Sequence, residues 1–114
     1  MVGENAMVEG FWILEIRVLQ YTTGGVAIFT NGKVFGGDNA FTWMGAYSTD
    51  GKIIKGRVNV HNFDPSVKSV LGVPGDYEMH FSGDVRGGVI AGTAIIANQP
   101  QHSLAIRFTK RADI

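Results

Sequence analysis

Apolar and polar residues alternate along almost the whole chain, and this pattern constrains the fold more than any other feature of the sequence. In residues 11–20, FWILEIRVLQ, one face carries Trp12, Leu14 and Ile16, and the other carries the charged Glu15 and Arg17. Successive side chains of a β-strand point to opposite sides, so a period of two indicates a strand with one buried face and one exposed face. The chain is therefore predicted to be built from strands.

The same period recurs in eight segments separated mostly by short turns. These segments are residues 11–20, 26–30, 33–35, 41–48, 52–61, 76–83, 89–98 and 102–110. Two of the intervening dipeptides, Asn31-Gly32 and Asp50-Gly51, are typical of type I′ hairpin turns, which need positive φ at both central residues. In residues 89–98, VIAGTAIIAN, small apolar residues occupy both faces, and the pattern does not assign the inward one.

Eight sequential antiparallel strands with one apolar face predict an all-β, up-and-down barrel, because closure leaves no free sheet edge. A flat sandwich of two sheets is the alternative. Glycine accounts for 16 of the 114 residues, and glycines inside strands permit the sharp coiling of a small barrel. Gly36-Gly37-Asp38 interrupts the strand pattern without a following helix, lysine or second acid, so we interpret it as a bend with an Asx-type turn.

One stretch departs from the strand pattern. In residues 63–75, Asp64 is suited to a helix N-cap, Pro65 to the first helical position and Gly72 to a C-cap, which predicts one short helix over residues 64–72. Residues 1–9 lack a pattern and are expected to form a flexible N-terminal extension. Residues 1–114 as a whole suit a single domain.

Composition argues against several classes of function. Lysine plus arginine equals aspartate plus glutamate, at ten each, so no nucleic-acid surface is indicated. The chain has no cysteine, no metal-ligand spacing among its three histidines, and no apolar run of the roughly 18 residues that would span a membrane. We expect a cytoplasmic protein that is not an enzyme and that uses no catalytic residue, metal or cofactor.

Large side chains on the predicted inner face form the first candidate site. They either fill the core or line a pocket for a small apolar ligand. These cavity candidates are Trp12, Leu14, Ile16, Trp43, Tyr77, Met79, Phe81, Ile106 and Phe108. Phe11 and Ile13 lie on the opposite, charged face of the first strand, so they form a candidate dimer surface unless the N-terminal segment or the short helix covers them.

Gly10-Phe11-Trp12, at the start of the first strand, resembles the G-x-W element of lipocalins. The resemblance implies that Trp12 closes the base of the barrel. It also implies that an arginine of the last strand packs over the indole, for which Arg107 or Arg111 could serve.

A second resemblance, over residues 7–113, is to the GrlR-type family, small bacterial negative regulators of type III secretion. The shared pattern comprises Gly10 and Trp12, Gly24-Gly25, Asn31-Gly32, Gly36-Gly37-Asp38, Gly45, a turn at residues 48–52, Ile53-Ile54, His61 and Phe63. It implies a lipocalin-like barrel, a homodimer, an apolar cavity and a regulatory role through contact with a transcriptional activator. In members from enteric pathogens an acidic run holds that activator. The matching partner-loop positions here, Thr49, Asp50, Gly51 and Lys52, carry one acid and one base.

Overall fold

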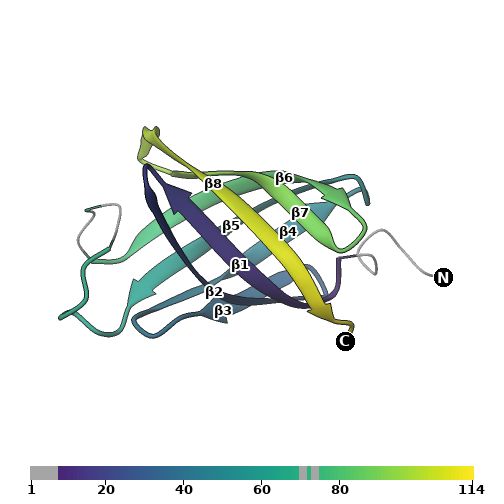
Figure 1. Ribbon diagram of the computed structural model, residues 1–114, viewed down its shortest axis with the longest axis horizontal. Helices are drawn as coiled ribbons and strands as arrows, with labels where there is room; N and C mark the ends of the chain where they lie inside the picture. Colours follow the sequence, from purple (N-terminus) through teal and green to yellow (C-terminus); the bar gives the residue numbers. More distant parts are fainter. Residues whose placement is uncertain (1–7, 70–71, 73–74) are drawn as a thin grey trace.

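Eight antiparallel strands close into a barrel in the computed structural model, which describes residues 8–69, 72 and 75–114 (Figure 1). The strands are β1 (Gly10–Val18), β2 (Tyr21–Thr30), β3 (Lys33–Gly37), β4 (Phe41–Thr49), β5 (Ile53–Asn62), β6 (Tyr77–Arg86), β7 (Val89–Ile96) and β8 (Gln99–Ala112). Each strand pairs with the next, and β8 pairs with β1. The predicted up-and-down barrel is therefore confirmed, and the flat sandwich is wrong.

The predicted faces of the strands are also confirmed. Trp12 and Leu14 are buried in β1, whereas Phe11 and Ile13 of the same strand are exposed. In β7, whose inward face the sequence left open, Ile90, Ala94 and Ile96 are buried. Every described strand thus contributes alternate residues to one interior, and the alternation of the sequence follows directly from closure of the sheet.

Trp43 explains why glycines crowd β2 and β3. A Cβ atom on Gly36 would overlap the Trp43 indole nitrogen, and a Cβ on Gly25 would lie 2.9 Å from the same ring. The indole can therefore lie against the inner wall, where its Nε1 donates to the Val26 carbonyl at 3.1 Å. The Gly36-Gly37 pair continues β3 instead of interrupting it.

Asp38 forms the predicted Asx-type turn at the end of β3. Its Oδ1 accepts hydrogen bonds from the amides of Ala40 and Phe41, each at 2.9 Å. Of the two predicted type I′ turns, Asn31-Gly32 is confirmed, with φ of 50° and 76°.

The second turn prediction, at Asp50-Gly51, is wrong. The Asp50 amide donates to the Ile53 carbonyl, so Gly51 and Lys52 are the central residues. Of these two residues only Gly51 has positive φ, so the turn is not type I′. The reason is that the Asp50 carboxylate accepts from the Lys52 and Ile53 amides, which holds Asp50 outside the turn centre.

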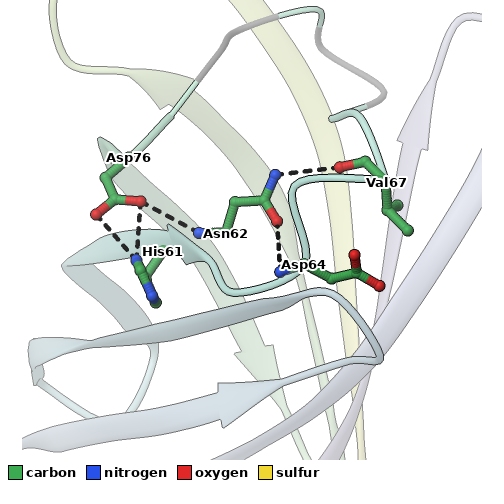
Figure 2. Close-up of polar contacts among 5 residues, drawn as sticks. All are labelled: His61, Asn62, Asp64, Val67 and Asp76. Carbon is green, nitrogen blue, oxygen red and sulfur yellow. Dashed lines mark hydrogen bonds and ion pairs between the residues drawn. The ribbon is translucent and has the colours of Figure 1, made fainter.

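The predicted helix over residues 64–72 is not present among the described residues. The Asp64 carboxylate does accept from the Ser66 amide and hydroxyl, as a cap would, and Val67 N donates to Asp64 O at 3.0 Å. Gly72 N donates to Ser69 O at 3.0 Å in a second turn of the same kind, and the two turns do not form an α-helix. Asn62 explains why the first turn ends at Val67, because its side chain accepts a hydrogen bond from the Asp64 amide and donates one to the Val67 carbonyl (Figure 2). An isolated turn fixes the dihedral angles of three residues for one hydrogen bond, which makes helix nucleation unfavourable.

Residues 1–7 of the expected N-terminal extension lie outside the described residues, and residues 8 and 9 contact the barrel. Val8 is fully buried, and Glu9 Oε2 accepts from the Asn31 amide at 2.7 Å. Within the described residues, no helix is long and apolar enough to cross a membrane.

Candidate functional site

One end of the barrel is closed by Trp12 and the aromatic side chains around it. Trp12 is fully buried, its Nε1 donates to the Val8 carbonyl at 2.8 Å, and its ring meets Phe29 edge to face at 5.9 Å. Phe29 in turn packs against Tyr47 and Phe108. This cluster fills the interior at the end where β1 begins and β8 ends (Figure 1).

A lysine, and not the expected arginine, covers the plug. The Lys110 ammonium lies 5.5 Å from the centre of the Trp12 ring, whereas Arg107 and Arg111 are exposed. The reason is that alternate residues of β8 point to opposite faces of the sheet. Phe108 points inward, so even-numbered neighbours share its face, and Lys110 stands opposite Trp12 in the β1–β8 register.

The other end of the barrel is hollow. A cavity of about 170 Å³ lies between the strands there. Eight of the nine cavity candidates line it, namely Leu14, Ile16, Trp43, Tyr77, Met79, Phe81, Ile106 and Phe108. Trp12 does not, because it belongs to the closed end. The inner face therefore divides into a packed half and an open half, which the sequence pattern could not separate.

Several further cavity residues were not among the candidates. The wall also includes Val34, Val58, Val60, Ala94 and Leu104. Val34, Val58, Val60 and Leu104 continue the inward alternation of their strands, so the pattern itself could have indicated them. Ala94 lies on β7, whose inward face the pattern left open. The polar rim is different: Asn39, Lys68 and Ser69 come from loops, where no periodicity points to a common site.

Tyr77 contributes a hydroxyl group to the mouth of the cavity. Its hydroxyl lies 3.3 Å from the Ser69 hydroxyl. Burial raises the pKa of the Tyr77 phenol, the Ser69 hydrogen bond opposes that shift, and the Asp38 carboxylate adds to it. The phenol therefore stays neutral at ordinary pH and can donate or accept a hydrogen bond at the mouth.

The base of the loop between β5 and β6 is held by a small polar cluster near the mouth (Figure 2). His61 Nδ1 lies 2.9 Å from both carboxylate oxygens of Asp76, and the Asn62 amide donates to the same carboxylate at 3.2 Å. The hydrogen bond with His61 is the largest cause of the lowered pKa of Asp76, followed by the Asn62 amide. Both side chains are exposed, so this cluster positions the loop and does not form a buried site.

Tyr47, at the closed end, has the one buried side-chain polar atom that lacks a hydrogen bond within the described part of the chain. Burial is the main cause of its raised pKa, and the Gly32 backbone nearby opposes the shift without hydrogen-bonding geometry. The hydroxyl lies among Phe29 and its neighbours, away from the cavity mouth.

The outer surface carries an apolar row that joins the two dimer candidates to residues from three more strands. In the register of β1 to β4, Phe11 stands opposite Ile28, Ile28 opposite Phe35, and Phe35 opposite Met44. These four side chains are 36 to 53% exposed, and Ile13 extends the patch along β1 at 38%. We call Phe11, Ile28, Phe35 and Met44 the outer apolar row. Ile28, Phe35 and Met44 were missed because only the strand register places them beside Phe11.

The partner-loop candidates form a turn whose polar groups largely bind one another. Thr49 Oγ1 donates to the Ile53 carbonyl at 2.7 Å and accepts from the Gly51 amide at 3.0 Å. Backbone hydrogen bonds, from Ile53 first and then Lys52, lower the pKa of the Asp50 carboxyl. The only acid of this turn is therefore engaged with its own backbone.

Among the residues that the structure describes, no group of three or more histidine, aspartate or glutamate side chains could hold a metal ion. His61 and His80 each pair with one nearby carboxylate. No protein-family model matches the chain, and no curated protein matches it.

Proposed function

We propose that this protein binds a small apolar ligand in the open half of the barrel. The observation that carries the proposal is the cavity of about 170 Å³, whose walls are aliphatic and aromatic and whose polar groups stand at the mouth. An apolar pocket with a small number of polar groups directed toward it is typical of ligand sites. The proposed role is one of binding, because the lining of the cavity is mostly aliphatic and aromatic.

The volume sets the size of the ligand. An apolar cavity of roughly 150 Å³ is enough to bind benzene. The buried part of the ligand should therefore be about one aromatic ring or a short branched alkyl group. A hydroxyl or carbonyl on the same molecule could bind Tyr77 or Ser69 at the mouth.

The test uses Trp43, the tryptophan that lines the cavity, as the reporter. Toluene, indole and a short-chain alcohol are titrated while ligand-detected NMR and tryptophan fluorescence are recorded. Val58→Phe should abolish binding, because Val58 lines the cavity and the larger ring would fill part of its volume. Val89→Phe is the matched control, since Val89 alternates with the buried Ile90 and points outward. Equal binding by both variants would disprove an interior site.

We propose, as a second function, regulation through protein contact, and the outer apolar row favours it. Four large apolar side chains in register across four strands span about 14 Å, and scattered single hydrophobics would not give such a row. A two-fold pairing of the row with a second copy would bury it, and a homodimer is what the resemblance to the GrlR-type family implies. The same resemblance supports a transcriptional activator as a further partner.

Analytical ultracentrifugation tests the homodimer. Phe35→Asp places a charge at the middle of the row and should raise the dimer dissociation constant at least roughly tenfold. Leu19→Asp is the control, because Leu19 is a more exposed apolar residue in the turn between β1 and β2. Affinity capture from bacterial cytoplasm then tests the regulatory partner, and recovery of no protein at stoichiometric amounts would count against it.

A further inference from the structure

A second and larger hollow lies on the outer surface of β4, β5, β6 and β7, with a volume of about 680 Å³. Its outward side chains alternate along each strand with buried ones such as Tyr47 and Phe81. The polar side chains that matter to its chemistry are Ser48, Lys55, Arg57, His80, Ser82 and Thr93. We call this hollow the basic groove.

The strand register arranges these side chains in two rows. Ser48, Lys55, Ser82 and Thr93 stand opposite one another across the four strands. Every one of them carries a hydrogen-bond donor, and none is an acid. In the adjacent row Arg57 stands opposite His80.

The two strongest cations of the basic groove lack an acidic partner. The ion pairs within the described chain are formed by His61, His80 and Lys110, so Lys55 and Arg57 pair with none of its carboxylates. Both side chains are exposed. Positive charge that the described chain does not neutralise is therefore concentrated on one face of β5.

Acidic residues limit the basic groove on both sides. Glu78, opposite Asn59, lies one row beyond Arg57, and Asp84, opposite Ile53, lies one row beyond Lys55. Glu78 already binds His80 at 2.6 Å. The cationic region is consequently only two rows deep, and a long polyanion would meet carboxylates at either end.

We propose that the basic groove binds an extended acidic peptide segment of a partner protein, with carboxylates at alternate positions. Lys55 and Arg57 are two residues apart on one strand face, which corresponds to about 6.7 Å. Alternate side chains of an extended peptide repeat at the same distance, so two carboxylates can reach the two cations together. The hydroxyls of Ser48, Ser82 and Thr93 lie in the Lys55 row, where they can donate to the same peptide.

A peptide fits this surface better than a nucleic acid does. The flanking Glu78 and Asp84 would repel a backbone that carries a phosphate at every nucleotide. No aromatic side chain points outward into the groove to stack with bases, which single-strand binders use. The proposed site is separate from the outer apolar row and does not depend on ligand binding inside the barrel.

Fluorescence polarisation tests the proposal with a labelled peptide in which Glu and Thr alternate. We expect weak binding at low ionic strength that weakens further as salt is added. Two comparison peptides separate charge from spacing: one replaces Glu with Gln, and the other has the same composition with the Glu residues adjacent. Both should bind more weakly. A single-stranded oligothymidylate and inorganic phosphate serve as the competing anions.

Lys55→Gln and Arg57→Gln should each weaken peptide binding roughly three- to tenfold, and the double variant should abolish it. Arg111→Gln makes the same change of charge at an exposed site of β8 and should change the affinity less than about twofold. Circular dichroism checks that each variant is folded. Unchanged binding by the double variant, equal binding of the Gln peptide, tighter binding of the oligonucleotide, or no peptide binding at millimolar concentration would each overturn the proposal.

Discussion

Replacement of the Trp12 plug by alanine should be among the most destabilising changes that this barrel can undergo. Trp12 is 0% exposed, and truncation of a buried Trp costs about 3–5 kcal/mol. The Val8 carbonyl then loses the indole donor, which adds about 1 kcal/mol or more, and the cation–π contact of Lys110 adds roughly 0.5–1 kcal/mol. We therefore expect a loss of about 4.5–7 kcal/mol in the free energy of unfolding.

A loss of that size approaches the total stability of many domains, which is about 5–15 kcal/mol. Trp12→Phe is therefore measured beside Trp12→Ala, because it keeps a buried ring and loses the hydrogen bond. We expect it to cost roughly 2–3 kcal/mol. Urea unfolding followed by circular dichroism gives both values.

Phe11→Ala is the matched control for the plug. Phe11 is the adjacent aromatic residue of the same strand but is 36% exposed on the other face, so its truncation should cost only about 1 kcal/mol. The reasoning would be refuted if Trp12→Ala cost less than about 1 kcal/mol. It would also be refuted if the two alanine variants were equally destabilised.

Two further predictions concern β-strand pairing and the loop base. Gly92→Ala should destabilise the protein by about 2–4 kcal/mol in urea unfolding, because the added Cβ would overlap the Ser82 carbonyl oxygen. Gly88→Ala is the control, because a Cβ there makes only ordinary contacts, and it should change stability by less than about 0.5 kcal/mol. Similar values for the two variants would contradict the β6–β7 packing. His61→Ala should raise the pKa of Asp76 toward its ordinary 3.8, as measured by NMR titration of the carboxyl carbon. Because the pKa of Asp76 is lower in the folded protein, its contribution to the stability of the fold is present above the unfolded pKa and is lost as pH falls through the folded pKa. An unchanged pKa of Asp76 in the His61→Ala variant would show that His61 is not the main cause of the shift.

The fold could be predicted because closure of the barrel imposes one rule on every strand. Alternation alone placed Trp43, Met79 and Ile106 inside, since a slip by one residue would expose all of them. The same rule, applied further along β8, would have indicated Lys110 in place of Arg107 or Arg111 over Trp12. The family resemblance suggested an arginine, but Arg107 and Arg111 lie at odd positions of the strand and face away from the interior into which Phe108 points.

The candidate site could be predicted only in part, because its limits depend on register and on local space. Alternation identifies the inner face, but it does not show that Trp12 and Phe29 fill one end while Leu14 and Trp43 border a hollow at the other. The outer apolar row has the same origin. Ile28 and Met44 lie on different strands, and only the paired register through Phe35 brings them into one line.

The period of two also makes the three candidate surfaces separable by experiment. On β5, Val58 points into the cavity, whereas its neighbour Arg57 points into the basic groove. Phe35 lies on the outer apolar row of β3, next to the buried Val34 of the cavity wall. A substitution at one position of such a pair changes one surface. The neighbouring residue in the sequence points to the other side of the sheet, so the surface that it belongs to is unchanged. Loss of ligand, dimer and peptide binding should therefore occur in different variants, and a single substitution that abolished all three would indicate unfolding and not a shared site.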